Sequence, residues 1–248
     1  MSFDHAVSRL GWCVQNFRGY QKKILRDAFF EAFETYETGC APVIQELNSG
    51  VRPERQTELL DRAAEAMLGE LSAGWEKKND MEDEKVILAI FFVPMVRKLQ
   101  LPVSEEFVSL LQKKWVERYP KSPFYLGDYE SISGGFRKKF LGLCFITTAV
   151  CQELGKPDDC AELTAFRAFR DGYLAAQPDG EALIREYYNI APGIVTCINT
   201  CSDRHASYER IREQYLTPCY EDLLAGRNAD CKTRYVQMVR DLERKYLN

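Results

Sequence analysis

The chain lacks the sequence signals of most enzyme classes. It has only two histidines, His5 and His205, and it contains no P-loop and no G-x-G-x-x-G, G-x-S-x-G or H-E-x-x-H motif. A Cys-His dyad would therefore have to recruit one of these two histidines. No Glu-x-x-His pair is present for a di-iron site. These absences leave an enzymatic activity undecided and favour a protein that binds over one that catalyses.

Long apolar runs and runs of one charge sign are also missing. The most hydrophobic uncharged segment, residues 86–96, is too short to span a bilayer and suits a buried helix. The net charge is −4, with acidic and basic residues interspersed, so no footprint for nucleic acid or anionic lipid is visible. The first residues lack the apolar region of a secretory signal. We therefore expect a cytoplasmic protein that binds neither nucleic acid nor membrane.

No segment alternates apolar and polar residues as strands do, whereas apolar residues recur at helical spacing through most of the chain. Hydrophobic residues make up 46% of the 248, which is enough to bury a core. The sequence therefore predicts an all-α fold, a compact bundle of about nine to eleven helices with no significant sheet.

Glycine, proline and serine predict where some helices end. Gly39, after Thr38, is expected to stop a helix, because glycine is common after a helix C-terminus. Pro94 is expected to kink or break the helix over 81–99, because proline removes a backbone donor. Ser104, followed by two glutamates, is expected to be the N-cap of the next helix.

Residues 120–135 are rich in proline, glycine, serine and aromatic side chains, and we expect them to form a loop or linker. This segment separates an N-terminal helical region, 1–119, from a C-terminal helical region, 136–248. The sequence leaves open whether the two regions pack as one unit.

Three of the nine cysteines fall within seventeen positions, at Cys144, Cys151 and Cys160. On one helix, Cys144 and Cys151 would lie about 10 Å apart in axial rise. They could not pair with each other, and Cys160 on the next helix is the expected partner for either. If Cys144 began its helix, the exposed N–H groups would lower its pKa and make it reactive. The simpler interpretation is a tightly packed core helix, and the alternative is a set of reactive or ligating thiols.

The run CFITTAVC, the helix around Phe-Arg-Asp and the Tyr-Tyr pair before a proline together resemble the small bacterial domain called the CFI-box. The resemblance covers residues 144–192 and implies a helical module, but no particular reaction. The residues that carry it are Cys144, Phe145, Ile146, Thr148, Ala149, Phe169, Arg170, Asp171, Leu174, Tyr187, Tyr188 and Pro192.

Two arginines and two tyrosines in this region are candidate anion-binding or ligand-binding residues. Arg167 and Arg170 lie three apart, and an arginine fork suits a carboxylate or phosphate. The alternative is an internal ion pair. Tyr187 and Tyr188 are expected to be half-buried, with hydroxyls that find polar partners.

A second cysteine group lies further along the chain. Cys197, Cys201 and His205 follow at four-residue intervals and would share one helix face. Two thiolates so spaced could hold a soft metal ion with further ligands. The alternative is two core thiols and a surface histidine. No cofactor is predicted, and a transition metal or Fe–S cluster is a secondary hypothesis.

These patterns favour an all-helical binding or accessory protein that recognises a protein or small ligand. The expected site is a groove near residues 120–145, where four aromatic residues precede a basic run, Arg137 to Lys139. The rival is a metal-binding or thiol redox protein that uses Cys144, Cys151 and Cys160. A Cys144 nucleophile is a third hypothesis, and the oligomeric state stays unknown. The four aromatic residues are Phe124, Tyr125, Tyr129 and Phe136.

Overall fold

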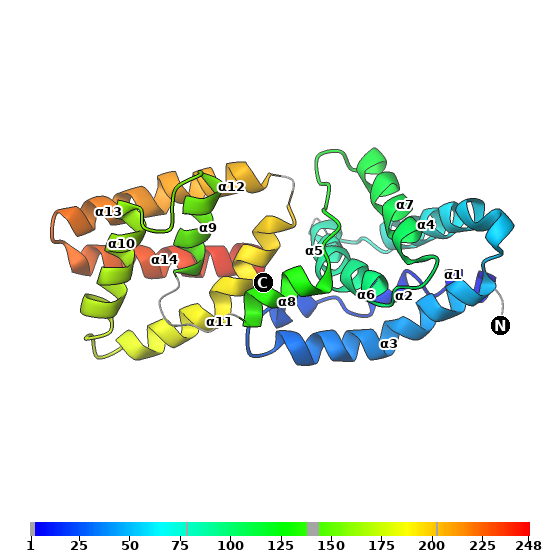
Figure 1. Ribbon diagram of the computed structural model, residues 1–248, viewed down its shortest axis with the longest axis horizontal. Coiled ribbons are helices and arrows are strands. Elements are labelled where there is room, and N and C mark those ends of the chain that lie inside the picture. Colours follow the sequence, from blue (N-terminus) through cyan, green and yellow to red (C-terminus); the bar gives the residue numbers. More distant parts are fainter. Residues whose placement is uncertain (1–2, 78, 138–143, 202) are drawn as a thin grey trace. The chain divides into compact units, whose positions relative to one another are not determined.

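The computed structural model describes residues 3–77, 79–137, 144–201 and 203–248. The prediction of an all-α fold is confirmed, because these residues form helices and no strand, apart from one isolated β-bridge between Phe124 and Cys201 (Figure 1). Two compact units are present. Unit 1 comprises Met1–Lys23, Ala28–Gly134 and Thr200–Ser202, and unit 2 comprises Ile24–Asp27, Gly135–Asn199 and Asp203–Asn248.

Unit 1 is built around a cluster of aromatic side chains. Phe91 lies at its centre, with ring centroids 5.5 Å from Tyr36, 5.9 Å from Phe29 and 6.1 Å from Phe33. The helices of this unit are α1 (Phe3–Val7), α2 (Trp12–Gln15), α3 (Phe29–Gly50), α4 (Gln56–Ala73), α5 (Asp80–Ile87), α6 (Val93–Lys98), α7 (Ser104–Arg118) and the first part of α8 (Tyr129–Arg137).

The expected helix stop at Gly39 is wrong. Helix α3 continues through Gly39 and Pro42 to Gly50, and its buried face continues with it, through Cys40, Val43, Ile44 and Leu47. Burial of this apolar face outweighs the weak helix propensity of single glycine and proline residues, which is a matter of a few kcal/mol.

The helix also continues through Pro94. The π-helical turn Leu88–Phe92 joins α5 to α6, and the N–H of Val93 reaches back five residues to the carbonyl of Leu88. This wider turn adjusts the hydrogen-bond ladder just ahead of the proline, which has no N–H to donate. All residues of the turn are buried.

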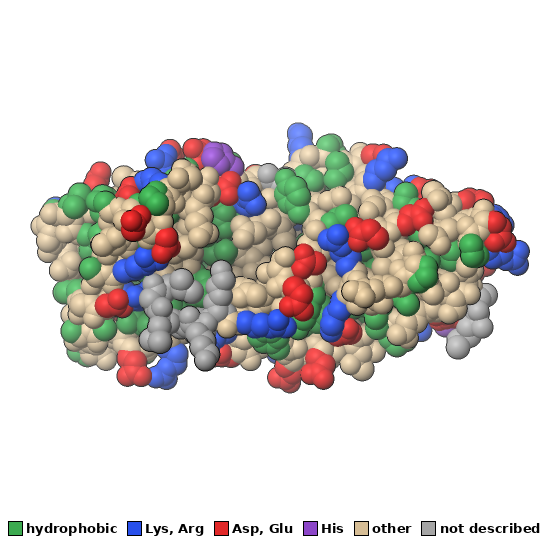
Figure 2. Space-filling view, viewed as in Figure 1, with side chains coloured by type: hydrophobic (Ala, Val, Ile, Leu, Met, Phe, Trp, Pro, Cys, Tyr) green, Lys and Arg blue, Asp and Glu red, His purple; other side chains and the backbone are tan. Residues whose placement is uncertain are grey.

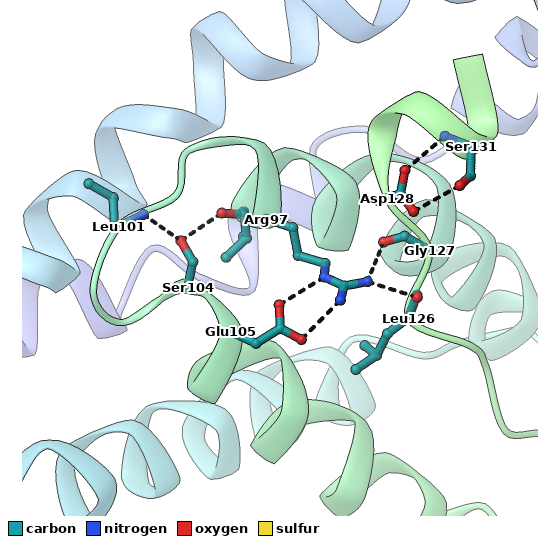
Figure 3. Close-up of polar contacts among 9 residues, drawn as sticks. Arg97, Leu101, Ser104, Glu105, Leu126, Gly127, Asp128 and Ser131 are labelled. Atoms are coloured by element: carbon teal, nitrogen blue, oxygen red, sulfur yellow. Dashed lines mark hydrogen bonds and ion pairs between the residues drawn. The ribbon is translucent and has the colours of Figure 1, made fainter. Parts of the chain in front are cut away.

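Ser104 is the first residue of α7, but the prediction that its side chain caps the helix is wrong. Its hydroxyl donates to the carbonyl of Val96 at 2.7 Å and accepts from the N–H of Leu101 at 3.2 Å (Figure 3). The serine therefore closes the turn between α6 and α7.

Arg97 fastens the segment after α7 to the end of α6 (Figure 3). Its Nε and Nη2 bind the carboxylate of Glu105 at 2.9 and 3.0 Å. Its Nη1 donates to the carbonyls of Leu126 and Gly127 at 2.9 and 3.2 Å. Arg97, in α6, thus binds both α7 and the irregular segment 119–128.

Only the first part of the predicted loop 120–135 is irregular, because α8 begins at Tyr129. The carboxylate of Asp128 accepts hydrogen bonds of 2.8 Å from the N–H and the hydroxyl of Ser131, and so caps the helix start. Ile132 and Ser133 are buried. A local cap and a buried face therefore make a helix from a sequence rich in serine and glycine.

Unit 2 packs α11 against both α9 and α14. The segment Ile24–Asp27 also lies against α11, because a Cβ on Gly193 would come 1.8 Å from the carbonyl oxygen of Ile24. The helices are α9 (Phe145–Glu153), α10 (Ala161–Ala168), α11 (Gly180–Asn199), α12 (Arg204–Ile211), α13 (Thr217–Leu224) and α14 (Asn228–Tyr246). The π-helical turn Phe169–Leu174 extends α10, and the π-helical turn Arg212–Leu216 joins α12 to α13.

Acidic and basic side chains are interspersed over the face shown in Figure 2. Among the residues that the structure describes, no helix has both the length and the apolar character needed to cross a membrane.

Candidate functional site

A pocket with mainly apolar walls opens in unit 2. Its empty volume, including the part open to solvent, is about 610 Å³. The π-helical turn after α10, together with α11 and α14, supplies most of the lining, and the start of α9 adds Cys144. The apolar side chains that define the pocket are Phe166, Phe169, Leu174, Leu183, Ile184, Val236 and Val239.

A few polar groups face the same space. Cys144, Arg170, Tyr187 and Tyr235 line it together with an ion pair between Glu186 and Arg240. In that pair Arg240 Nη2 lies 2.7 Å from Glu186 Oε2, and both side chains are partly exposed. The pocket thus combines apolar walls, a small number of polar groups and a charged pair near solvent, as ligand sites commonly do.

Cys144 occupies the N-cap position of α9 and is only 4% exposed. Arg170 Nη1 donates a hydrogen bond to its sulfur at 3.5 Å. Burial nevertheless raises the pKa of the Cys144 thiol, and the nearby Arg170 and Arg167 only partly oppose this effect. The expectation of a lowered pKa at a helix start is therefore wrong here, because burial disfavours the thiolate more than the helix start and the arginines favour it.

Arg170 is buried in the π-helical turn, and its charge is balanced by its neighbour. Nε and Nη2 bind the carboxylate of Asp171 at 2.6 and 2.8 Å, which raises the pKa of Arg170 and lowers that of Asp171. Arg167 has a similar internal partner, Asp158, whose Oδ1 lies 2.9 Å from its Nη2. The structure therefore gives both candidate anion-binding arginines the internal ion pairs that the sequence left as the alternative.

The two predicted tyrosines have different surroundings. The Tyr187 hydroxyl is buried and lies 3.4 Å from the hydroxyl of Tyr235, which in turn lies 3.2 Å from Thr147 Oγ1. Burial raises the pKa of both Tyr187 and Tyr235. Tyr188 is only half-buried and packs its ring against Phe145, at 6.2 Å between centroids. Sequence reasoning missed Tyr235, which lies beyond the region of the CFI-box resemblance.

Two of the three clustered cysteines are neighbours. The sulfur atoms of Cys151, in the last turn of α9, and Cys160, the N-cap residue of α10, lie 3.7 Å apart. Burial, with a smaller contribution from Cys160, raises the pKa of Cys151 to about 12. Cys144 lies at the opposite end of α9 and contacts Arg170 instead. The predicted partnership with Cys160 thus involves Cys151 alone.

Two further pairs of neighbouring cysteines were not found from the sequence, and each pair joins two successive α-helices, α2 with α3 and α13 with α14. The sulfur of Cys40 lies 3.8 Å from the carbonyl of Cys13, and that of Cys219 lies 3.9 Å from the carbonyl of Cys231. All four side chains are fully buried.

The predicted group Cys197, Cys201 and His205 does not share one helix. Helix α11 ends at Asn199, Cys201 forms the β-bridge with Phe124, and α12 begins at Arg204. The side chain of His205 is 62% exposed, with Nδ1 3.3 Å from Glu153 Oε1. Within the described parts of the chain, no three His, Cys, Asp or Glu side chains are placed to hold a metal ion.

The expected groove near residues 120–145 falls partly outside the described residues, since Lys138 and Lys139 belong to the segment 138–143. Of its aromatic residues, Phe124 and Phe136 are buried, and the ring of Tyr129 packs 4.6 Å from that of Phe33. Tyr125 alone among the four is largely exposed, at 52%. These aromatic side chains therefore serve mainly as core residues.

Seven of the twelve residues that carry the CFI-box resemblance line the apolar pocket or bind a residue that lines it. Five of them line it, namely Cys144, Phe169, Arg170, Leu174 and Tyr187. Asp171 holds Arg170, and the backbone of Ile146 binds Tyr187. Comparisons with protein-family models, curated proteins and solved structures found no match, so the resemblance itself stays a prediction.

Proposed function

We propose that unit 2 is a binding module that takes up a small, mainly apolar molecule carrying one uncharged hydrogen-bond acceptor. The observation that carries this proposal is the buried Nη1 of Arg170, which donates to the thiol of Cys144 at the pocket wall, while the Tyr188 hydroxyl also accepts from this arginine. Sulfur is a weak acceptor, so a carbonyl or hydroxyl oxygen of a ligand would make a stronger bond with this donor.

The apolar walls favour the body of such a molecule. Each square ångström of apolar ligand surface buried there contributes about 25 cal/mol. The half-buried side chains Leu174, Leu183, Ile184 and Val236 would lose exposed surface when the pocket is filled.

The charge balance around Arg170 favours an uncharged head group. The Arg170 guanidinium already binds Asp171 through two of its nitrogens. A carboxylate ligand would have to leave water for a site whose positive charge is already compensated, which is costly in a low-dielectric setting. An alcohol, ketone or amide is uncharged and needs only one hydrogen-bond donor from the protein.

This proposal retains the binding function and the cytoplasmic location expected from the sequence and transfers the site from the 120–145 groove to the pocket. We also propose that residues 144–192 are a CFI-box-like element whose matching residues build the pocket. A Cys144 nucleophile receives less support, because its raised pKa leaves little thiolate at neutral pH.

The pocket's methyl groups allow a direct test with 1-hexanol and hexanoate as probes. In methyl NMR spectra of the full chain, 1-hexanol should shift the signals of Leu174, Leu183, Ile184, Val236 and Val239 in a saturable manner. Hexanoate, with the same number of carbons, should bind more weakly. Leu183→Trp should fill the pocket and abolish the shifts, whereas Leu224→Trp, at a residue that is 71% exposed, should leave them intact. Shifts that persist unchanged in Leu183→Trp would contradict the proposal.

A further inference from the structure

The short connection between α9 and α10 places two thiols in contact at its two ends. The sulfur atoms of Cys151 and Cys160 lie 3.7 Å apart, nine positions apart in sequence. A disulfide requires about 2.05 Å between the sulfurs, so the two atoms need to approach by less than the length of one S–S bond. Cys151 lies in the last turn of α9, whereas Cys160 is the N-cap residue of α10 and so lies at the end of the connection.

Backbone and side-chain bonds hold this connection in shape. The N–H of Lys156 donates to the carbonyl of Cys151 at 2.9 Å, and the N–H of Cys160 donates to the carbonyl of Pro157 at 3.1 Å. Gly155 adopts a φ of 68°, in the left-handed region that glycine tolerates. The connection therefore keeps the two cysteines together without help from a covalent link.

Solvent access separates this pair from the other cysteine neighbours. Cys160 is half-exposed and Cys151 is buried behind it. In the pairs Cys13 with Cys40 and Cys219 with Cys231, every side chain is fully buried. A reagent in solution can thus reach one sulfur of the α9–α10 pair and neither sulfur of the other two pairs.

An ion pair between Lys156 and Glu162 lies beside the two thiols. The positive charge of Lys156 lowers the pKa of Cys151 and the negative charge of Glu162 raises it, so the two charges oppose each other and burial keeps this pKa above its ordinary value. The half-exposed Cys160 is therefore the sulfur that reacts first with a reagent, and Cys151 reacts second.

We propose that Cys151 and Cys160 are a dithiol–disulfide site that exchanges with low-molecular-weight disulfides. The Cys160 thiolate attacks one sulfur of the reagent RSSR, forms a mixed disulfide and releases one RS⁻. The Cys151 sulfur, after giving up its proton, attacks the Cys160 sulfur and expels the second RS⁻. The protein loses two electrons and two protons, and the reagent becomes two molecules of RSH. This site is independent of the apolar pocket and of the ligand proposed for it.

Mass spectrometry of the intact, reduced full chain after treatment with glutathione disulfide tests the proposal. The wild-type protein should lose about 2 Da, and peptide mapping should place the disulfide between Cys151 and Cys160. Cys151→Ser should instead trap the intermediate and gain about 305 Da, as one glutathione on Cys160. Cys160→Ser should show neither change at this site. Cys201→Ser, which removes another half-exposed thiol, should behave as the wild type.

Circular dichroism melts of the reduced variants verify that each is folded. Peptide mapping of the oxidised wild-type chain tests the disulfide even if a variant does not fold. Reduced glutathione should restore the original wild-type mass. A stable glutathione adduct on wild-type Cys160 without the 2 Da loss, a disulfide mapped to other cysteines, or no oxidation at all would each overturn the proposal.

Discussion

The hydroxyl of Tyr187 accepts a hydrogen bond of 3.0 Å from the backbone N–H of Ile146, forty-one positions away in the sequence. Ile146 lies in the first turn of α9, and Cys144, the N-cap residue, makes no side-chain capping bond. The tyrosine therefore satisfies a helix N–H that a serine or aspartate satisfies in most helices. Because Tyr187 also lines the pocket, the start of α9 and the pocket wall depend on the same side chain.

Replacing this hydroxyl should destabilise unit 2. Tyr187→Phe keeps the ring but leaves the buried Ile146 N–H without its partner, so we expect the free energy of unfolding to fall by about 1–2 kcal/mol. Urea denaturation followed by circular dichroism measures this loss. Tyr173→Phe is the matched control, because no hydrogen bond to its hydroxyl occurs among the described residues and its ring is half-exposed. An equal loss in both variants would contradict the capping role.

The cysteines should differ strongly in their reactivity toward iodoacetamide. The thiolate is the reacting species, and burial raises the pKa of both Cys144 and Cys151, so both should react slowly at pH 7. The two half-exposed thiols, Cys160 and Cys201, should be alkylated first. Peptide mapping after brief labelling, compared with labelling in urea, measures the order. Fast, selective alkylation of Cys144 in the folded protein would instead favour the nucleophile hypothesis.

Much of the fold follows from helical periodicity. The spacing of Leu60, Ala64, Met67 and Leu71 predicts the buried face of α4, and all four are buried. Helix ends were harder to predict. The glycine and the proline within α3 destabilise the helix by less free energy than the burial of its continuous apolar face contributes. The short helix α8 was missed because its serine-rich and glycine-rich composition is typical of a loop. Its N-terminal cap and its buried residues stabilise the helix nevertheless.

The candidate site was predictable only where its contacts are local. The neighbourhood of Cys160 and Cys151 follows from a short connection between two helices, and the Arg170–Asp171 pair joins adjacent residues. Tyr235 meets Tyr187 across forty-eight positions, through the packing of α14 against α11. No periodicity in one helix reveals which face of a distant helix will cover it.

Unit 1 depends on a buried carboxylate. Glu84 is fully buried, and it accepts hydrogen bonds from Arg18 Nε at 2.8 Å and from the indole N–H of Trp75 at 2.7 Å. Glu84→Ala removes the acceptor of both donors, so we expect a loss of about 2–3 kcal/mol. Glu84→Gln keeps one acceptor oxygen and should lose less. Urea unfolding followed by tryptophan fluorescence measures the change, and exposed Glu117→Ala should have little effect.

The segment that Arg97 fastens should open when that arginine is removed. Arg97→Ala deletes the donors to Leu126 and Gly127 and the ion pair with Glu105. We expect faster hydrogen–deuterium exchange at the amides of residues 126–131, because local opening there becomes less costly. Arg55→Ala is the control, because Arg55 pairs with the exposed Glu58 instead. Unchanged exchange in Arg97→Ala would show that the segment is held by other contacts.

The junction of α13 and α14 should lose stability in acid. Asp222 has little exposed surface and accepts hydrogen bonds from Arg227 Nη2 at 2.7 Å and from Arg234 Nε at 2.9 Å. These bonds, that of Arg227 first, hold its pKa below the ordinary value of 3.8. The lowered pKa means that the folded state binds the proton less tightly than the unfolded state does. The contribution of Asp222 is therefore complete above about pH 4 and is lost as the pH falls through the lower, folded-state value.

Asp222→Asn tests this dependence, because asparagine keeps the shape but not the charge. Thermal unfolding midpoints measured between neutral pH and pH 2 should show a constant deficit for this variant above the ordinary pKa of aspartate. The deficit should shrink below that pH, because the wild-type carboxylate becomes protonated and loses the same interactions. Asp230→Asn, at an exposed residue 3.7 Å from Arg227 Nε, should change the midpoint little at any pH. A deficit that stays constant down to pH 2 would assign the effect of Asp222→Asn to packing, because a contribution from the charge must shrink once the unfolded state takes up the proton.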